Sequence, residues 1–520
     1  MKKTWLLVLA VAVLFCLPLT AQAKTDFELG GYIRMDAIWN STNTMGHALS
    51  NYVVRNNVLN AHHGRFQMNA NATRFNFTIK GPELWGGKVT GFIEVDFDGA
   101  MAAGQDYFNQ ARLRLRHAMF KIAWPDREIL FGQFWSVNSE LIPDIADAGA
   151  FCLYGATQLR LPQVRYTHKF TDEFNASLAI AAGQNGRWGL NTDLNNPIEG
   201  ELSETPMVEA KLRYEADLWG KAAWYGKPRG FYVGVGAAYL RTRSAATTFD
   251  NTRQTTYAFV NDEVGWLPVP NSNVNTNNWF TLGQSNYNAP AIAATPPAVF
   301  PGETDPRIIV QQTRARMNVR SSDYANHWLA LIENFTPIIP TTTKSLAGTL
   351  GLAHQWWIGQ GVSAWRLDYA ANDRYYTYSG PTPGVNNSFD YKLQFIKRYG
   401  GHAQLQYYWT EQIYTNLNFG FEKSFGFNAS RDNNAPGGFY YANPTGFDPV
   451  KSTWRASVTQ WYRPVPAVKF ALQYAYMRTD YFQTTSNVAA GQNNQVPANQ
   501  NNPSKYGENH SIMANAWYMF

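Results

Sequence analysis

The sequence has little charge, almost no cysteine and, after residue 20, no long hydrophobic run. No later stretch approaches the roughly 18 apolar residues that a transmembrane helix requires, which excludes a helical membrane protein. The two cysteines, Cys16 and Cys152, provide no disulfide framework. Charged residues make up only 16% of the chain, against about 25% in an ordinary soluble protein. The net charge of +6 is small and no Lys/Arg block occurs, so we expect no nucleic-acid partner.

The residues that are abundant point to a different class of protein. Aromatic residues make up 15% of the chain and glycine occurs 40 times, while the mean hydropathy is −0.36. A chain that is polar on average, rich in aromatics and poor in charge is typical of a transmembrane β-barrel. One face of each barrel strand contacts lipid and the other lines water.

The first residues predict export from the cytoplasm. Lys2 and Lys3 precede an apolar stretch at 5–19, and the small-x-small site Ala21-Gln22-Ala23 follows. This order of charged, apolar and small residues indicates a secretory signal peptide over 1–23. We expect residues 24–520 to form a single domain in the cell envelope.

Apolar and polar residues alternate in many segments. Between 26 and 39, for example, Phe27 and Leu29 share one phase and Glu28 and Tyr32 the other. Successive side chains of a strand point to opposite faces, so this pattern predicts strands with one apolar and one polar face. It predicts sixteen of them, at 26–40, 65–81, 87–98, 109–123, 127–136, 159–170, 173–184, 206–219, 228–243, 321–336, 344–360, 398–409, 413–426, 450–462, 466–479 and 509–520.

The connections between these segments alternate between short and long. This predicts an all-β fold, a transmembrane antiparallel barrel of about sixteen strands with short periplasmic turns and long extracellular loops. The longest predicted extracellular loop is 244–320. The last strand is amphipathic and ends on Phe520, as is typical of outer-membrane barrels.

Three arginines lie two residues apart in the fourth predicted strand. Arg112, Arg114 and Arg116 share one phase, and Leu113 and Leu115 occupy the other. An arginine facing lipid at the midplane costs about 2–4 kcal/mol, so we expect all three to face the lumen. Guanidinium is permanently charged and binds carboxylates through two hydrogen bonds, which suggests a basic track that concentrates anions. Four further residues are predicted to extend it: Arg34, Arg165, Lys211 and Arg213.

A structural role for these arginines is the alternative. The preceding strand directs Glu94, Asp96 and Asp98 inward, and cross-strand ion pairs could simply hold the wall together. The sequence leaves both interpretations open.

The segment 137–158 is the candidate constriction loop. It carries Glu140, Asp144 and Asp147. Acidic groups on a loop opposite a basic wall would set up a transverse field across the pore and influence its selectivity. An ordinary solvated acidic loop is the alternative.

No motif indicates an enzyme, a cofactor or a metal site. His62-His63 lacks acidic or cysteine companions, and neither a zinc-protease, a nucleophile-elbow nor a phosphate-loop pattern occurs. We therefore expect neither catalysis nor a bound cofactor.

Several segments resemble the DcaP-like porins of Gram-negative bacteria. The similar stretches are GGYIRMDAIW at 30–39, RLRLRHAMFKIAWP at 112–125, LFGQFWS at 130–136, RLPQVRYTHKF at 160–170 and QWYRPVPAVKFALQYAYMRTD at 460–480. The resemblance implies a sixteen-stranded homotrimer in the outer membrane. It also implies passive diffusion of small hydrophilic solutes, with a preference for anions such as carboxylates.

Two other functions stay open. A saccharide-type or nonspecific porin could use inward aromatics as a stacking surface, and the candidates are Tyr32, Phe92, Tyr232, Tyr408 and Tyr414. A closed structural or adhesion barrel would instead bind partners through its extracellular loops. Outer-membrane lipid is an expected partner in every case.

Overall fold

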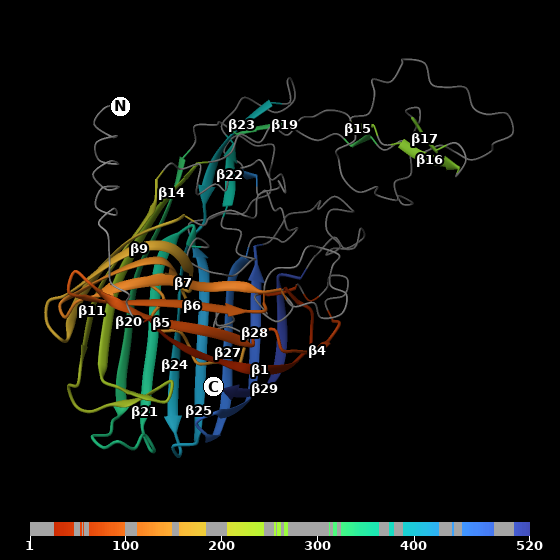
Figure 1. Ribbon diagram of the computed structural model, residues 1–520. Helices are drawn as coiled ribbons and strands as arrows, with labels where there is room; N and C mark the ends of the chain where they lie inside the picture. The colour runs from red at the N-terminus through yellow and green to blue at the C-terminus, as the bar shows by residue number, and fades with distance from the viewer. Residues whose placement is uncertain are drawn as a thin grey trace, which may run out of the picture.

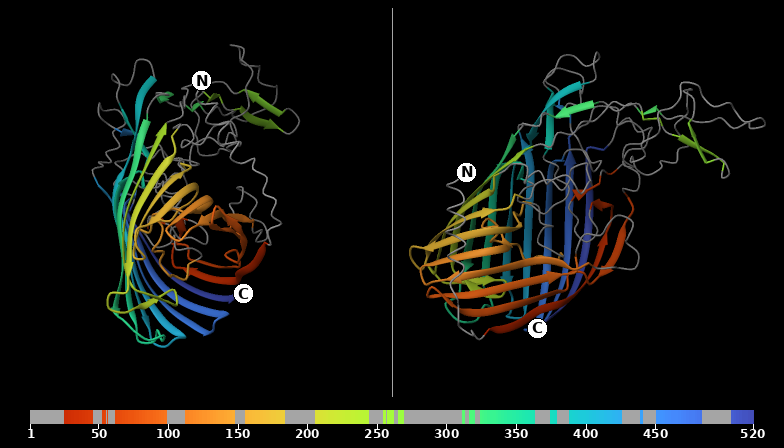
Figure 2. Two further views of the ribbon diagram at one scale, coloured as in Figure 1. Left: turned by 60° about the vertical axis from the view of Figure 1, so that its left-hand side comes forward. Right: turned by 45° about the horizontal axis from the view of Figure 1, so that its top comes forward.

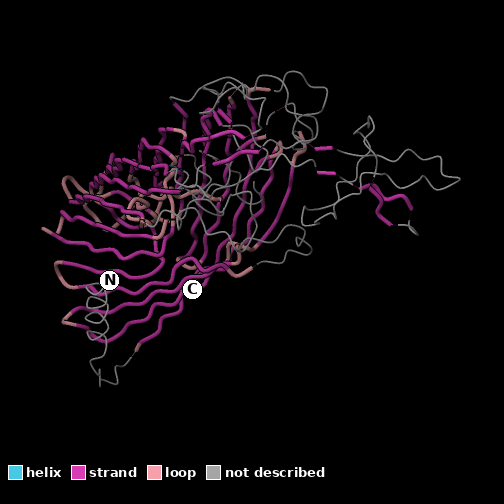
Figure 3. The backbone as a smooth tube through the Cα atoms, turned by 90° about the horizontal axis from the view of Figure 1, so that it is seen from above, coloured by secondary structure: helices cyan, strands magenta, loops and turns pink. Residues whose placement is uncertain are grey.

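A computed structural model of the chain describes its barrel strands and parts of its loops. The described residues are 25–45, 52–54, 56, 62–98, 112–147, 155–183, 205–243, 254–255, 257–261, 265–268, 311–312, 316–319, 324–362, 374–378, 388–425, 439–440, 450–482 and 504–520. Regular structure among them is almost entirely β-strand (Figure 3). None of the described residues belongs to a helix long and apolar enough to cross a membrane.

One antiparallel sheet forms a closed barrel. It contains seventeen strand segments, but β4 (Arg65–Asn69) and β5 (Arg74–Leu84) are two parts of one interrupted strand that both pair with β1 (Asp26–Asn40). Strand β1 also pairs with β29 (Tyr506–Met519), from Tyr32 opposite Met519 to Asn40 opposite Ser511. This pairing joins the first strand to the last and makes a sixteen-stranded barrel.

The other strands follow one another around the barrel in chain order. They are β6 (Gly87–Asp96), β7 (Arg114–Ala123), β8 (Arg127–Trp135), β9 (Arg160–Lys169), β10 (Phe174–Ala181), β11 (Met207–Ala216), β14 (Phe231–Arg243), β20 (Tyr324–Ile339), β21 (Leu350–Gln360), β24 (Lys397–Tyr408), β25 (Ile413–Phe425), β27 (Val450–Val465) and β28 (Val468–Tyr481). In Figure 1, β5 to β7 cross in front of β20 to β28, and Figure 2 shows these two groups as opposite walls.

The sixteen strands expected from the sequence are all present. Their ends differ by a few residues; β7, for example, begins at Arg114 rather than at 109. Short and long connections alternate as predicted. The two-residue turn between β5 and β6 places Trp85 and Gly86 at φ of 52° and 74°, as a type I′ hairpin requires.

The long loop 244–320 lies mostly outside the described residues. Its described parts are the short strands β15 (Gln254–Thr255), β16 (Tyr257–Asn261), β17 (Gly265–Pro268), β18 (Gln311–Gln312) and β19 (Arg316–Val319). Five more short strands lie in other connections: β2 (Thr44–Met45), β3 (Tyr52–Val53), β22 (Arg374–Tyr378), β23 (Ser388–Phe395) and β26 (Phe439–Tyr440).

The two faces of the barrel separate as the alternation predicted. On β1, Phe27 is 69% exposed and Ile33 54%, whereas Arg34 and Asp36 are buried. Exposed aromatics also occur at the short-turn rim, among them Trp85, Trp409, Tyr462 and Tyr518. An apolar outer band edged with aromatics is the surface that a bilayer covers.

A β-bulge in β7 changes which residues face inward. Strand β6 pairs Glu94 with His117 and Val95 with Leu115, so the register shifts at this point. Leu113 and Leu115 are exposed before the shift, and Phe120 is exposed after it. An inserted residue of this kind interrupts strict alternation, so the phase of Arg114 does not continue through the strand.

The turn between β11 and β14 is longer than the sequence predicted. It contains a small hairpin of β12 (Ala222–Trp224) and β13 (Lys227–Arg229). Ala222 and Ala223 are fully buried and pack with residues of the barrel wall, including Phe335 and Tyr408. This hairpin therefore folds into the short-turn end of the barrel.

Candidate functional site

The segment after β8 crosses the barrel interior. The Ser136 hydroxyl donates to Glu209 on β11 at 2.7 Å, and the Asp144 backbone amide donates to Gln404 on β24 at 2.7 Å. The Ala146 amide then donates to Gln473 on β28 at 2.9 Å. Residues 136–147 thus run along the inner wall from β11 toward β28. Among the described residues, no hydrogen bond or ion pair joins 137–147 to β5, β6 or β7.

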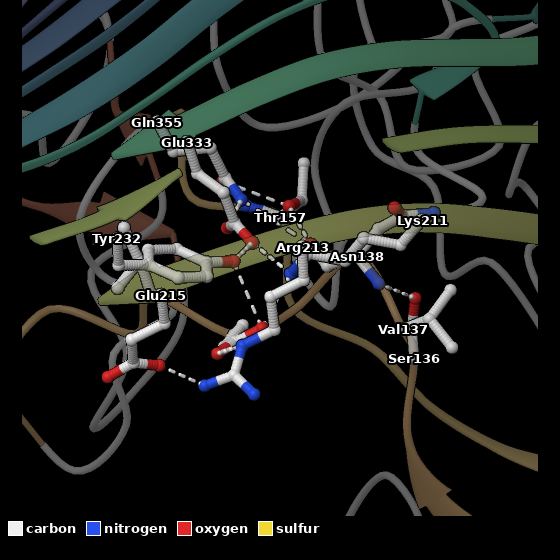
Figure 4. A network of polar contacts seen from close by, with 12 residues as sticks. Ser136, Val137, Asn138, Thr157, Lys211, Arg213, Glu215, Tyr232, Glu333 and Gln355 are labelled. Carbon is white, nitrogen blue, oxygen red and sulfur yellow. Dashed lines mark hydrogen bonds and ion pairs between the residues drawn. The ribbon is translucent and has the colours of Figure 1, made fainter. Parts of the chain in front are cut away.

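Glu140 is the first anchor of this loop (Figure 4 shows part of its surroundings). Its carboxylate forms ion pairs with Lys211 at 2.9 Å, Arg213 at 3.0 Å and Arg229 at 3.1 Å. Burial raises the pKa of Glu140, but these three cations outweigh burial and lower the pKa to about 2. Glu140 is therefore ionised over the physiological pH range.

The cations around Glu140 are balanced by other carboxylates. Lys211 also binds Glu333, and both Arg213 and Arg229 also bind Glu215. Three cations and three carboxylates therefore share one network, which Tyr232 completes by hydrogen bonds to Glu140 and Glu333. Lys211 and Arg213, which we expected to extend the basic track, lie in this network against the loop.

Asp144 and Asp147 anchor the far end of the loop. Asp144 accepts a hydrogen bond from Tyr414 at 3.1 Å and forms an ion pair with Lys469 at 3.4 Å. Asp147 forms an ion pair with Arg455 at 2.5 Å, and both side chains are at most 5% exposed. All three predicted loop acids thus pair with cations of the wall or the hairpin, and Asp144 and Asp147 are also buried.

Arg34 also holds the loop. Its guanidinium donates to the Ala146 carbonyl at 2.5 Å and pairs with Asp36 at 2.6 Å on its own strand. It lies 4.4 Å from the ring of Trp517 and is only 2% exposed. Arg34 therefore contributes to loop attachment rather than to the track on β7.

The β12–β13 hairpin supports the loop from the short-turn side. The Tyr225 hydroxyl donates to the carbonyl of Ile142 at 2.7 Å, and Arg229 at the end of β13 binds Glu140. The loop is thus held by both the barrel wall and this hairpin.

The arginines of β7 pair with the acids of β6. Arg114 holds Asp96 by two hydrogen bonds of 2.7 and 2.8 Å and reaches Asp98 at 3.1 Å. Arg116 binds Glu94 at 2.6 Å and Asp96 at 2.8 Å. The cross-strand pairing that was the alternative interpretation is therefore present. It does not decide the role of these arginines, because Arg114 remains 24% exposed while Arg116 is 4% exposed.

Several further arginines lie on this side within the part of the chain that the structure describes. Arg160 packs 5.3 Å from the ring of Trp135, which Arg116 also approaches at 6.0 Å. Arg165 lies against Phe134 and forms no ion pair within the described residues. Six arginines on this side lie in β5, β7 and β9 or, for Arg112, just before β7. We call them the arginine wall: Arg74, Arg112, Arg114, Arg116, Arg160 and Arg165. Within the described residues, these arginines pair with Glu94, Asp96 and Asp98.

Sequence reasoning missed several residues of this interior. Arg455 and Lys469 lie inside correctly predicted strands, and the inward phase of each strand could have identified them. Arg74 and Arg160 could have been found in the same way from the inward phases of β5 and β9, which lie two strands from β7 on either side. No sequence pattern pointed to Arg229, because the segment before the predicted strand 228–243 was expected to be a simple turn.

The candidate stacking aromatics are mostly inaccessible. Tyr408 and Tyr414 stack on each other at 4.5 Å and are 2% and 4% exposed, and Tyr232 is fully buried. Only Tyr32 and Phe92 of the five are partly accessible. They therefore do not form a continuous sugar-binding surface.

The closed barrel with its apolar outer band and inward-folded loop has the architecture of an outer-membrane porin. A search of solved structures finds the outer membrane channel DcaP of Acinetobacter baumannii, with 14% identity, a TM-score of 0.56 and coverage of 95% of this chain and 97% of that one. At this identity the comparison shows a shared fold, and it confirms the fold that the DcaP-like resemblance implied.

Other porins match less well. An anion-selective porin from Comamonas acidovorans has 8% identity and a TM-score of 0.44 over 96% of this chain and 100% of that one. OmpF of Salmonella typhi has 10% identity and a TM-score of 0.44 over 95% and 97%. TM-scores this low are too weak to support an argument. No protein-family model and no curated protein matches the chain.

Proposed function

We propose that this protein is a porin of the bacterial outer membrane, a passive diffusion channel for small hydrophilic solutes with a preference for anions, including carboxylates. The observation that carries the proposal is the arginine wall, in which six arginines lie together on one side of the barrel and Arg114 stays 24% exposed. An excess of fixed positive charge beside a water-filled path raises the local anion concentration and lowers that of cations.

The position of the loop supports this proposal. Residues 137–147 bind the opposite wall, and their three acids are paired there with cations. The acidic charge of this part of the loop is therefore largely compensated by the opposite wall, and these acids do not neutralise the arginine wall. The loop would narrow the path and leave the arginine wall as its charged border.

Arg114 is better placed than Arg116 to meet a solute. It is more exposed than Arg116 and reaches Asp98, whose side chain is 25% exposed. A passing carboxylate could share its guanidinium, because guanidinium offers five donors in a planar arrangement. Arg116, which is buried and paired with Glu94 and Asp96, would instead hold the wall together.

The proposed assembly is a homotrimer surrounded by outer-membrane lipid, as the resemblance implies. No catalytic step is proposed, because a diffusion channel needs only the charges and the path described above.

Solute uptake into proteoliposomes tests the proposal against its alternatives. With purified protein, we expect succinate to enter faster than an uncharged sugar of similar size and much faster than a diamine. Preferential entry of maltotriose, blocked by longer oligosaccharides, would favour a saccharide-type porin. Uptake no faster than that of empty liposomes, with a folded barrel, would favour a closed structural or adhesion barrel.

A further inference from the structure

A cavity of about 800 Å³ lies on the barrel at the ends of β25, β27, β28 and β29 that are farthest from the short turns. Four basic residues line it: Lys423, Lys451, Arg478 and Lys505. It also contains Asp480 and the ring of Tyr506. The proposed pore does not use this cavity.

Strand register places the cavity on the outer surface. Lys423 pairs with Ser452, Ser452 with Asp480, and Asp480 with Tyr506, so one row of residues crosses four strands. Three rows closer to the short turns, the same phase holds Leu417, Val458, Tyr474 and Ile512. These four residues are 39–52% exposed, which makes this the lipid-facing phase.

The outward rows change in character along the strands. The next row toward the short turns holds Phe421, Trp454, Arg478 and Glu508, and the row after it holds Phe419, Ala456, Tyr476 and His510. Charged residues are thus confined to the first two rows, aromatic residues are frequent in the second and third, and the fourth is mainly aliphatic. This follows the order of headgroup, interface and hydrocarbon in a bilayer. The cavity is therefore at the headgroup level of one leaflet.

The cavity has uncompensated positive charge. Arg478 is paired with Asp480 at 3.0 Å and Glu508 at 3.1 Å. Lys423, Lys451 and Lys505 form no ion pair within the described residues. Lysine ammonium groups are mobile point charges that bind phosphate well.

We propose that this cavity binds the phosphate-bearing headgroup of a lipid in the outer leaflet, with the acyl chains lying along the aromatic and aliphatic rows below. A soluble phosphate would use only the lysines, whereas a lipid uses both the lysines and the apolar rows. The inference rests on the membrane placement of the proposed porin, but not on its anion preference.

The test measures binding of diphosphorylated lipid A to the detergent-purified full chain by native mass spectrometry. Fully dephosphorylated lipid A and inorganic phosphate serve as the two comparison probes. We expect the diphosphorylated lipid to bind, the dephosphorylated lipid to bind far more weakly, and inorganic phosphate to compete poorly.

The decisive variant is Lys423→Gln/Lys451→Gln/Lys505→Gln. Basic residues at an anionic membrane surface each change affinity by about fivefold, so the triple variant should lose about a hundredfold. A matched control, Lys88→Gln/Lys227→Gln/Lys344→Gln, changes three exposed lysines near the short-turn rim and should bind normally. The triple Lys→Arg variant at the cavity should retain binding, which separates a charge effect from misfolding.

Equal binding by the decisive and control variants would overturn the inference, as would equal binding of the dephosphorylated lipid. Binding of inorganic phosphate as tight as that of the lipid would also overturn it, in favour of a soluble anion site. Solute uptake measured on the same samples separates the two proposals. Lipid binding without uptake contradicts only the porin function, and uptake without lipid binding contradicts only the cavity.

Discussion

The two sides of the barrel interior differ in the charged side chains that they present and in how these are paired. From β11 to β28 the wall presents amides such as Gln404 and Gln473, together with ion pairs that are balanced within their own network. From β5 to β9 it presents six arginines, for which the described residues supply the carboxylates Glu94, Asp96 and Asp98 as partners. Both sides come from the same inward phase of amphipathic strands, yet only the first binds the described part of the loop.

The difference has a simple physical origin. A loop that enters a barrel brings backbone amides and carbonyls that need hydrogen-bond partners. Side-chain amides supply such partners without adding charge, and the wall from β11 to β28 does this at Gln404, Gln473 and Asn416. A wall of arginines would require an equal number of loop acids. We call the wall from β11 to β28 the docking side, because it holds the loop. The arginine wall is left to contact solutes.

The largest expected effect comes from breaking a buried ion pair on the docking side. Arg455→Met leaves Asp147 buried without its cation, since the two side chains are 1% and 5% exposed. Loss of one partner of a buried pair costs about 3–5 kcal/mol. We expect a comparable loss in the free energy of unfolding, measured in guanidinium, and a changed single-channel conductance as the loop end is released.

The double variant Arg455→Met/Asp147→Leu is its control. Removing both charges should recover much of the lost free energy of unfolding, because no isolated charge remains. A double variant as unstable as the two single losses combined would show that this pair does not anchor the loop.

The second-largest effect is expected from acid, which should weaken the attachment of the loop to the docking side. The pKa of Glu140 is lowered from 4.5 to about 2, so its ion pairs stabilise the fold above pH 4.5, and this contribution is lost as the pH falls toward 2. The loss is about 3 kcal/mol at most. Unfolding and conductance measured between pH 5 and pH 2 should show this dependence.

Glu140→Gln should remove that component of the pH dependence, whereas Glu28→Gln, at an exposed position, should leave it in place. The same pH dependence in both variants would mean that other carboxylates control the loop.

A smaller effect is expected on the arginine wall. One unit charge about 10 Å from an ion in water changes its energy by about 0.4 kcal/mol, or about twofold in local concentration. Arg114→Ser should therefore reduce the chloride-to-potassium permeability ratio by about twofold to fourfold. Arg116→Gln, at a side chain that is 4% exposed, should mainly lower stability. Equal selectivity in wild type and Arg114→Ser would make the pairing on β7 purely structural.

The smallest effect is expected at the short-turn rim. Lys80 and Glu28 form an ion pair there, but both are more than half exposed, and solvent screens such pairs. Lys80→Gln should leave both the unfolding midpoint and the permeability ratio within experimental error. A clear shift in either would mean that the rim contributes to one of the two walls.

Most of the fold could be predicted from the sequence because alternation reports directly which face of a strand meets lipid. The sixteen strands and their short and long connections all follow from it. The bulge beside Arg116 could not be predicted, since an inserted residue leaves no mark in the composition of β7. The hairpin ending at Arg229 was missed because its residues look like an ordinary turn.

The candidate site could be predicted only in part. The sequence indicated that Arg114 and Arg116 share a strand with inward polar residues and that Glu94 and Asp96 are neighbours. The sequence could not show that Lys211 lies outside the arginine wall, because Glu333, the partner of Lys211, is 122 residues away in the chain. Such pairings are determined by how the loop and the strands come together in space, not by local sequence.

The reversal potential of the purified protein in a planar bilayer, under a potassium chloride gradient, tests the central claim most directly. If the arginine wall borders the conducting path, the potential will shift toward the chloride equilibrium potential, and Arg114→Ser will reduce that shift. A shift toward the potassium equilibrium potential would contradict the account, since the carboxylates and not the arginines would then dominate the pore.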